Sequence, residues 1–436
     1  KGRASRTGMI RVIGAGLAGC EAAWYLARHG EEVELVEQKP VRRSPAHSSD
    51  GLCELVCSNS LKSDDVFGNA CGLLKEEMRR LGSVTMEAAA ATRVPAGGAL
   101  AVDRERFSEY VTRKLRAEPR IRIVCREETE LPEAGIVATG PLTDGALYAA
   151  IERRFGGGLH FYDATAPVVT AESIDLSEAF TADRYGRGTG DYVNCPMDKP
   201  QYETFVRELL AAEKVTLHDF EKREIFEGCM PVEVMASRGK DSLRFGTFKP
   251  VGLADASGKR PYAVLQLRRE NAEGTLFGLV GCQTNLKFGE QKRVFSLIPA
   301  LRNAEFVRYG VMHRNTFLDS PRVLQADLSA KDNPMLFFAG QITGVEGYVE
   351  SAATGILAAA NCLRRLHAKP SLVPSDTCVM GALARYVAAE NAHFQPMNAN
   401  YGILRGPDIR DKKEKKKVMA ERALGEIELF RAALAE

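Results

Sequence analysis

The chain opens its regular pattern with a short apolar run, a glycine-rich turn and a helical repeat. Met9–Ile13 predicts a buried strand, and small apolar residues recur at helical spacing over 22–27 until Gly30 supplies a stop. Glu32–Glu37 then predicts a second strand that ends in an acid. This succession of strand, turn, helix and strand is typical of the start of a nucleotide-binding α/β domain.

Two later apolar segments predict further strands of the same sheet. Gly135–Gly140 ends in Ala-Thr-Gly, and Met335–Gly340 leads into a second glycine-rich turn. A helix rich in small residues is expected next, over Val349–Leu366. The arrangement resembles the FAD domain of two-dinucleotide-fold flavoproteins, in which a late strand–helix turn meets the flavin. Because segments of this FAD domain lie near both ends of the chain, the middle of the chain must be an insertion into that domain.

The middle of the chain changes character after a glycine-rich break at Tyr185–Gly190. Beyond it, Gln201–Ala212 predicts a helix, whereas Tyr262–Leu267 and Thr275–Val280 predict strands. The predicted fold class is therefore α/β, a Rossmann-like two-dinucleotide-fold FAD domain with an inserted α+β domain. We expect the FAD domain to be discontinuous, over 9–190 and 325–436, with the insertion domain over 191–324. The polar, basic residues 1–8 are expected to be a leader or a cloning remnant.

The glycine-rich turn has the residues that a dinucleotide requires. Gly14 permits the tight turn, Gly16 lets a pyrophosphate approach the backbone, and Gly19 allows close packing of strand and helix. The helix N-terminus offers free N–H groups and a positive dipole end to phosphates. Glu37 follows Gly19 by 18 residues, near the spacing of a ribose-binding carboxylate. The predicted cofactor-binding residues are Gly14, Ala15, Gly16, Leu17, Ala18, Gly19, Glu37, Gly140, Gly340 and Gln341.

Composition and charge restrict the remaining choices. The chain has 59 Lys and Arg against 57 Asp and Glu, so a nucleic-acid partner must be held by a local basic patch. No apolar run approaches the roughly 20 residues of a membrane span, which predicts a soluble protein. Ten scattered cysteines in a long chain favour reduced thiols and a cytoplasmic location. The chain has no CxxC and no paired histidines, so no metal site is expected.

Two cysteines lie in segments suited to chemistry. Cys57 stands among hydrogen-bonding residues in Cys53–Lys62, and Cys229 follows a glycine and precedes Met-Pro. Taken alone, either cysteine is more often a small buried hydrophobe than a nucleophile.

Several long motifs, in order along the chain, resemble those of the folate- and FAD-dependent tRNA (uracil-5-)-methyltransferase family. They are Gly14–Trp24, Pro45–His47, Glu54–Ser60, Leu74–Met78, Phe226–Glu233, Ala339–Tyr348 and Phe394–Asn400. The resemblance runs from Met9 essentially to the C-terminal helix.

The resemblance implies a defined reaction. NADH or NADPH reduces the FAD, methylenetetrahydrofolate gives a one-carbon unit to flavin N5, and that carbon passes to C5 of the T-loop uridine of tRNA. A cysteine adds to uracil C6 and so makes C5 nucleophilic. The resemblance implies that Cys229 is this nucleophile and that Cys57 serves beside the flavin, in proton transfer or in protecting the reactive carbon. The two roles are open to exchange on sequence grounds.

The folate site is also implied by the resemblance. His313 matches the histidine that covers the pterin, and Glu346 and Tyr348 are candidate pterin or active-site contacts. The lysines of 412–417, together with Arg405 and Arg410, are candidates for phosphate contacts, although such a run is often a solvated helix face. The insertion domain is expected to add to a positive rim around the flavin, because the target uridine must leave its stack.

Rival interpretations differ in substrate or in the role of the flavin. The related flavoproteins that modify wobble uridines share the glycine-rich start, but their chains are much longer and lack the Phe226–Glu233 and Phe394–Asn400 patterns. The same chemistry on ribosomal RNA, or an RNA-binding flavoprotein with a structural FAD, remains an alternative. A disulfide reductase is disfavoured because a second dinucleotide motif and a CxxC are both missing. The sequence leaves the oligomeric state and the choice between NADH and NADPH open.

Overall fold

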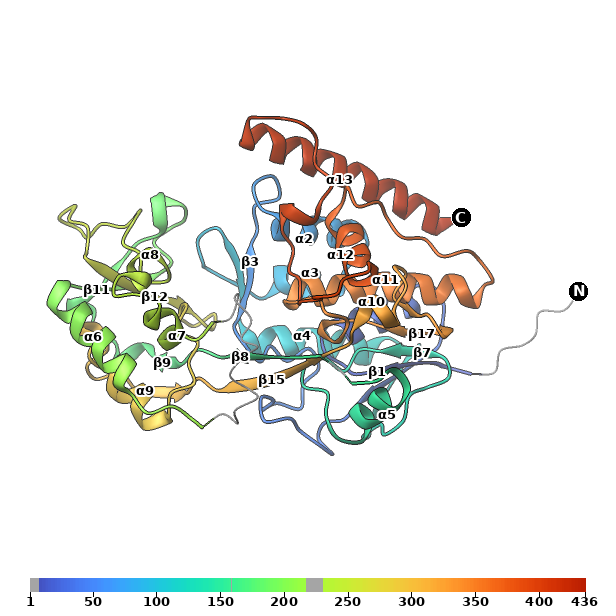
Figure 1. Ribbon diagram of the computed structural model, residues 1–436, viewed down its shortest axis with the longest axis horizontal. Helices are drawn as coiled ribbons and strands as arrows, with labels where there is room; N and C mark the ends of the chain where they lie inside the picture. The colour runs from blue at the N-terminus through green and yellow to red at the C-terminus, as the bar shows by residue number, and fades with distance from the viewer. Residues whose placement is uncertain (1–7, 158, 217–229) are drawn as a thin grey trace, which may run out of the picture.

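The computed structural model describes residues 8–157, 159–216 and 230–436. These residues form two lobes of unequal size, each built around its own sheet (Figure 1). The larger lobe holds both ends of the described chain, and the smaller lobe is made from its middle. The α/β class expected from the sequence is confirmed.

The sheet of the larger lobe collects strands from distant parts of the chain. Its order is β16 (Ser329–Ala330), β17 (Asn333–Phe338), β7 (Gly135–Val137), β1 (Ile10–Ile13), β2 (Val33–Glu37) and β6 (Ile121–Cys125). Neighbours are parallel except β16 and β17. The strands predicted near residues 9, 32, 135 and 335 are thereby confirmed. In the sheet, β7 lies between β1 and β17.

Helices cover both faces of this sheet. One face carries α1 (Leu17–Arg28), α4 (Arg104–Ala117) and α11 (Tyr348–Leu366), which share a hydrophobic core. The other face carries α5 (Gly145–Phe155), whose Leu147 and Ile151 pack with Val137 and Phe338. Small residues let α1 and α11 approach closely, since a Cβ at Gly355 would lie only 2.2 Å from the Ala18 carbonyl oxygen.

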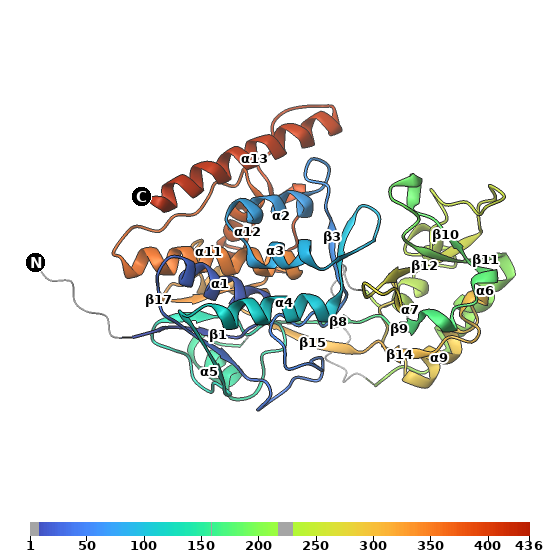
Figure 2. The same ribbon diagram turned by 180° about the vertical axis from the view of Figure 1, so that it is seen from behind.

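An outer helical layer is joined to this core by buried carboxylates. It comprises α2 (Ala70–Arg80), α3 (Val84–Ala91), α12 (Val379–Ala388) and α13 (Lys412–Ala435) (Figure 2). Glu77 accepts hydrogen bonds from the N–H groups of Val379 and Met380 at 3.0 and 3.1 Å, at the start of α12. Glu21 likewise accepts a bond from the Thr85 N–H at 3.0 Å in the first turn of α3. Motif acids of the sequence therefore serve as helix caps here.

The smaller lobe is an antiparallel sheet with helices packed on it. Its strand order is β10 (Phe180–Thr181), β11 (Val193–Met197), β12 (Ala263–Arg269), β13 (Leu276–Leu279), β9 (Val168–Thr170) and β14 (Phe306–Arg308). Its core is shared with α6 (Lys199–Ala211), α7 (Val232–Ser237) and α9 (Phe288–Phe295). The predicted helix near 201 and strands near 262 and 275 are confirmed. The sheet already includes β9 and β10, which precede residue 191.

Two smaller ladders lie between the lobes. β8 (Leu159–Ala164) pairs antiparallel with β15 (Met312–Phe317), and both run from one lobe toward the other (Figures 1 and 2). Beside them, β3 (Ser60–Ser63) pairs with β5 (Ala99–Val102), which also pairs with β4 (Arg93–Val94). Within the described ranges, none of the helices is long and apolar enough to cross a membrane.

Candidate functional site

The turn between β1 and α1 is shaped by three glycines with different surroundings. Gly14 has a φ of +99°, and a Cβ there would lie 2.2 Å from the Ala138 carbonyl oxygen. A Cβ at Gly19 would lie 1.7 Å from the Gly14 carbonyl oxygen, so this position needs glycine for packing. At Gly16, by contrast, no protein atom lies within 4 Å of the Cβ position. The turn is therefore rigid, with open space at the glycine expected to approach a pyrophosphate.

Glu37 ties the end of β2 to this turn. Its Oε2 accepts a hydrogen bond from the Ala15 N–H at 3.2 Å, and its Oε1 accepts one from the Lys39 N–H at 3.0 Å. The side chain is 8% exposed and borders the same cleft as Gly16. An acid at this place is positioned to accept from a ribose hydroxyl.

The cleft beside this turn has an open volume of about 1120 Å³. Its other walls come from the ends of β7 and β17 and the start of α11. The predicted cofactor-binding residues that line it are Gly14, Ala15, Gly16, Leu17, Ala18, Glu37, Gly140, Gly340 and Gln341. Gly19 does not line the cleft, because it packs beneath the turn against Gly14, so it acts through packing alone.

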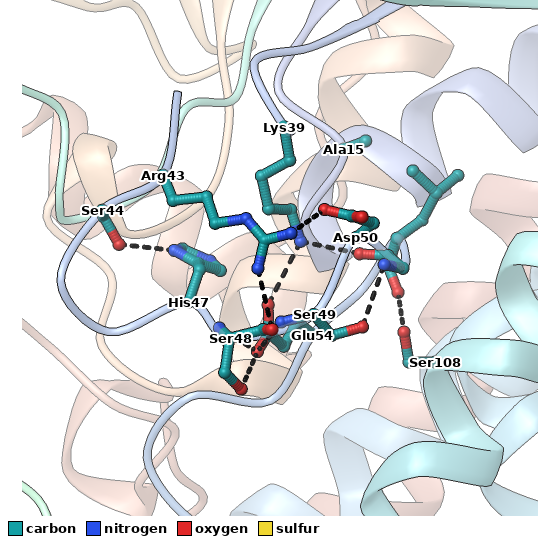
Figure 3. A network of polar contacts seen from close by, with 12 residues as sticks. Ala15, Lys39, Arg43, Ser44, His47, Ser48, Ser49, Asp50, Glu54 and Ser108 are labelled. Atoms are coloured by element: carbon teal, nitrogen blue, oxygen red, sulfur yellow. Dashed lines mark hydrogen bonds and ion pairs between the residues drawn. The ribbon is translucent and has the colours of Figure 1, made fainter. Parts of the chain in front are cut away.

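The outer wall of the cleft is a loop organised by a buried ion pair (Figure 3). Lys39 Nζ lies 3.2 Å from Glu54 Oε2, and these side chains are 4% and 8% exposed. Glu54 Oε1 also accepts from the Ser48 N–H at 2.8 Å, while His47 Nδ1 lies 2.5 Å from Ser44 Oγ. Because a buried charge is costly without a partner, the pair holds the loop in one conformation.

These features fit a dinucleotide cofactor. The cleft combines an open position at Gly16, an α1 N-terminus without a side-chain cap, and a carboxylate at the end of β2.

A second cavity continues from the first and brings the predicted catalytic Cys57 together with the three predicted substrate-binding residues. Cys57, His313, Glu346 and Tyr348 all line it, although they come from the loop before β3, from β15, from the turn before α11 and from the first residue of α11. The cavity has an open volume of about 1040 Å³. Tyr348 also lines the first cleft, so the two spaces meet there.

The Cys57 thiol is buried and electrostatically surrounded. Tyr348 Oη accepts hydrogen bonds from the N–H groups of Cys57 and Ser58, at 2.6 and 3.1 Å. Burial raises the pKa of the Cys57 thiol to about 12, and the negative charges of Asp163 and Glu346 add to the rise. At pH 7 only about one such thiol in 10⁵ is ionised. Cys57 is therefore a neutral thiol in this environment.

Two arginines hold the Cys57 loop from either lobe. Arg104 Nη1 donates to the Leu55 carbonyl oxygen at 2.6 Å, and Arg104 Nη2 lies 3.0 Å from Glu270 Oε2 in the smaller lobe. Arg308 of β14 donates to the Val56 carbonyl oxygen. Both positive charges act to lower the pKa of the Cys57 thiol, but burial outweighs them.

Glu346 is a buried carboxyl group at the glycine-rich turn. Its side chain accepts a hydrogen bond from Gln341 Nε2 at 3.3 Å, and its N–H donates to the Met397 carbonyl oxygen at 2.8 Å. Burial raises the pKa of Glu346 to about 7, Lys62 opposes this rise, and Asp163 adds to it. A carboxyl group that titrates near neutral pH can serve as a proton acceptor or donor.

His313 stands opposite Asp163 in the ladder of β15 and β8. Burial lowers the pKa of His313, and the positive charge of Arg308 lowers it further. The imidazole is therefore neutral at pH 7, as suits a ring that stacks on an aromatic ligand. His313 also borders a third cavity, which lies between the lobes and reaches Arg308 and Glu270.

The sequence reasoning did not single out several residues of the second cavity. Lys62 Nζ lies 3.6 Å from Glu350 Oε1, and Glu350 Oε1 also accepts from the Ala399 N–H at 2.9 Å. Asn398 and Asp163 line the cavity as well. Lys62, Glu350 and Asn398 lie in or beside the motifs that carry the family resemblance, and this position was the only feature of the sequence that marked them as candidate site residues.

Cys229 lies outside the described residues. The chain is described again from Met230, and the N–H of Val232 donates to the Gln283 carbonyl oxygen at 2.7 Å. Gln283 lines the second cavity. Val232 follows Cys229 by only three positions.

Comparisons of the sequence give a consistent group of relatives. The model of the family described as "Glucose inhibited division protein A" matches residues 9–370. The chain is 57% identical to the methylenetetrahydrofolate--tRNA-(uracil-5-)-methyltransferase TrmFO of Desulfitobacterium hafniense, over 97% of this chain and 98% of that protein. It is 56% identical to the protein of the same name from Acetivibrio thermocellus, over 95% and 97%.

Two solved structures with a similar fold are crystals of GidA. The chain resembles Aquifex aeolicus GidA in its form II crystal with a TM-score of 0.71 at 17% identity, covering 98% of this chain and 74% of that one. The form I crystal gives a TM-score of 0.67, again at 17% identity, with coverages of 98% and 78%. At this identity the likeness concerns the fold, and it confirms the expected architecture.

Proposed function

The chain belongs to the methylenetetrahydrofolate--tRNA-(uracil-5-)-methyltransferase TrmFO family, and from this premise we propose that it methylates C5 of the T-loop uridine of tRNA. The carbon comes from methylenetetrahydrofolate, the cofactor is FAD, and the reductant is NADH or NADPH. The observation that carries the proposal is the cavity where Cys57, His313, Glu346 and Tyr348 meet beside the dinucleotide cleft.

The first cleft is the proposed FAD site. Gly16 and the N-terminus of α1 would receive the pyrophosphate, and Glu37 would accept from the ribose. When bound, FAD supplies electrons taken from NADH or NADPH and carries the one-carbon unit from the folate to the uracil. The turn from Gly340 to Tyr348 and the start of α11 would face the reactive end of the cofactor, where the two cavities meet.

The cysteines take different roles in this proposal. Uracil C5 becomes nucleophilic only after a thiolate has added to C6. Because the pKa of Cys57 is about 12, its thiolate is scarce at pH 7, which supports Cys229 as the C6 nucleophile. The hydrogen bond from Val232, three positions after Cys229 in the sequence, to Gln283 of the cavity wall supports this assignment. Cys57 remains a neutral thiol for proton transfer, or protects the reactive carbon.

The second cavity holds the pterin in this account. The neutral His313 ring would cover one face of the pterin, and Glu346 and Tyr348 would border it.

We also place the enzyme in the cytoplasm, because every cysteine in the described ranges is free and tRNA is modified in that reducing compartment.

Glu346 is the proposed acceptor of the C5 proton, which must leave before Cys229 is expelled from C6. With a pKa of about 7, Glu346 becomes the active carboxylate as pH rises, so methylation should increase through about pH 7. Glu346→Gln should lower release of tritium from [5-³H]uridine tRNA by about 10²–10⁴-fold and remove this pH step. Tritium release between pH 5.5 and 9 measures both effects.

Asp163→Asn is the matched control, because Asp163 is another carboxyl group of the cavity. Its negative charge raises the pKa of Glu346, so its removal should retain the pH step and move it to lower pH. A Glu346→Gln enzyme that keeps the wild-type rate and pH step would contradict the role proposed for Glu346.

The acceptor is tested by mapping 5-methyluridine in RNA. After reaction with unmodified tRNA, nuclease fragments analysed by mass spectrometry should carry one added methyl in the T-loop fragment, and none when that uridine is changed to cytidine. Methylation of a ribosomal RNA transcript, with none of tRNA, would show that the enzyme performs the same chemistry on ribosomal RNA. A flavin that NAD(P)H does not reduce would favour an RNA-binding protein with a structural FAD.

A further inference from the structure

Neighbouring segments of the smaller lobe carry exposed positive charge and exposed aromatic rings. Residues 237–260 contain six Lys and Arg against two Asp, so the segment has a clear positive excess. We define the smaller-lobe basic surface by its exposed cations, which are Arg187, Arg238, Lys240, Lys249, Lys259 and Arg260. Asp241 and Asp255 reduce this excess without cancelling it, since six positive charges face only two negative ones over 237–260.

Hydrogen bonds join the segments that carry this surface. The Tyr185 N–H donates to the Gly252 carbonyl oxygen at 3.0 Å, and Arg184 Nη1 donates to the Val251 carbonyl oxygen at 2.6 Å. In α8 (Ser242–Phe245), Arg244 Nε donates to the Tyr262 carbonyl oxygen at 2.8 Å. The glycine-rich break, α8 and the start of β12 are therefore a single framework.

Two aromatic rings on this framework face solvent. Phe245 is 83% exposed and Tyr185 is 65% exposed, and the Arg187 guanidinium lies 5.8 Å from the Tyr185 ring centre. Exposed rings interleaved with cations are the combination that holds unpaired nucleotides, because bases stack on the rings while phosphates meet the charges.

The basic run at the start of α13 also has a ring beside it, since Lys416 Nζ lies 5.4 Å from the Tyr401 ring centre, but several of its cations contact other groups of the protein. Lys416 donates to the Gly68 carbonyl oxygen, Lys417 lies 3.8 Å from Glu421, and Arg405 lies 3.1 Å from Asp376. Its cations are thus partly occupied within the protein, and acids interrupt the run. The smaller-lobe basic surface is the stronger candidate of the two.

One helix, α7, connects this surface to the part of the smaller lobe beside β8 (Figures 1 and 2). α7 leads from the segment after Cys229 directly to Arg238, and it lies on the side of the smaller lobe next to β8 (Figures 1 and 2). β8 carries Asp163 of the cavity wall. At the other end of the surface, the loop after Tyr185 meets the larger lobe, since Asp191 Oδ2 accepts from the Gly97 N–H at 2.8 Å.

We propose that the smaller-lobe basic surface binds the substrate tRNA, with its cations on phosphates and with Tyr185 and Phe245 stacked on unpaired loop bases. The inference rests on the proposed function, because it takes tRNA as the substrate. To that function the inference adds the surface that holds the tRNA and the contacts that hold it there.

The electrostatic part is tested with the triple variant Lys249→Ala/Lys259→Ala/Arg260→Ala. At about 0.1 M salt we expect the Kd for unmodified tRNA to rise at least about tenfold, and the slope of log Kd against log salt to fall by about 2. The matched control, Lys412→Ala/Lys413→Ala/Lys417→Ala, removes the same charge from α13 and should change the Kd by less than about twofold. The proposal is overturned if the smaller-lobe variant binds tRNA with the wild-type Kd, or if only the α13 variant loses affinity.

The stacking part is tested with Tyr185→Ala and Phe245→Ala. Each should weaken tRNA binding by about 5–150-fold without changing the salt slope, since no charge is removed. Leu176→Ala is the control, because Leu176 is a 65% exposed apolar residue elsewhere on the same lobe, and it should bind tRNA as the wild type does. Wild-type binding by both aromatic variants would overturn the stacking role.

Two further measurements separate this inference from the proposed function. FAD content and NAD(P)H oxidation without tRNA should be unchanged in every surface variant, which verifies that each is folded. A wild-type protein that binds tRNA through this surface but does not methylate it refutes the function and supports the surface. A wild-type protein that methylates tRNA while the triple variant keeps the wild-type Kd refutes the surface alone.

Discussion

Replacing Cys229 with serine is expected to lower methylation of tRNA by about 10³-fold or more, because addition to uracil C6 needs a thiolate. The bound FAD and its reduction by NAD(P)H should remain, since Cys229 has no part in either. The partner variant, Cys57→Ser, should also lose turnover, but at a different stage. At pH 7 the Cys57 thiol, with a pKa of about 12, is almost entirely protonated and is a poor candidate for attack on C6.

Covalent trapping distinguishes the two cysteines. In tRNA that carries 5-fluorouridine, the fluorine blocks the loss of a proton from C5, so a thiolate added to C6 stays attached. Wild type and Cys57→Ser should form a protein–tRNA complex that survives denaturing electrophoresis, whereas Cys229→Ser should form none. The opposite pattern, with a complex in Cys229→Ser and none in Cys57→Ser, would exchange the two roles.

Gly16→Val is expected to give a folded protein that has lost FAD. No protein atom lies within 4 Å of the Cβ position at Gly16, so a side chain there meets nothing of the fold. It does enter the cleft where the pyrophosphate must approach the backbone, and we expect FAD affinity to fall by about 100-fold or more, some 2.7 kcal/mol. Flavin absorbance of the purified protein and a titration with added FAD measure the loss.

Two other glycines provide the controls. Gly289→Val makes the same change at an exposed position of α9, where the Cβ also has no neighbour within 4 Å, so FAD binding should be unchanged. Gly19→Val should instead destabilise the fold, because its Cβ would lie 1.7 Å from the Gly14 carbonyl oxygen. A Gly16→Val protein that binds FAD with wild-type affinity would show that the cofactor does not approach this turn.

The parts of the fold that were predictable are those specified by local sequence. β1, α1 and β2 follow from one apolar run, three glycines and one helical repeat, and β17 and α11 follow from a similar pattern. The smaller lobe was harder to delimit. Its sheet starts with β9 and β10, which have only three and two residues, and strands so short show no alternation that a sequence can reveal.

The candidate site was predictable residue by residue, through motifs, but its electrostatics were not. Cys57 owes its high pKa to burial together with Asp163 and Glu346, which come from segments more than 100 residues away in sequence. Arg308 reaches the Cys57 loop from β14, where nothing in the local sequence marks it. Such effects arise from tertiary packing, which the local sequence does not reveal.

The most direct test of the account is transfer of labelled carbon from methylenetetrahydrofolate to unmodified tRNA, with NAD(P)H present and S-adenosylmethionine absent. The account predicts label in 5-methyluridine of the T-loop, and no label when that uridine is replaced by cytidine. A folded, FAD-loaded protein that oxidises NAD(P)H yet leaves both tRNA and ribosomal RNA unlabelled would contradict it.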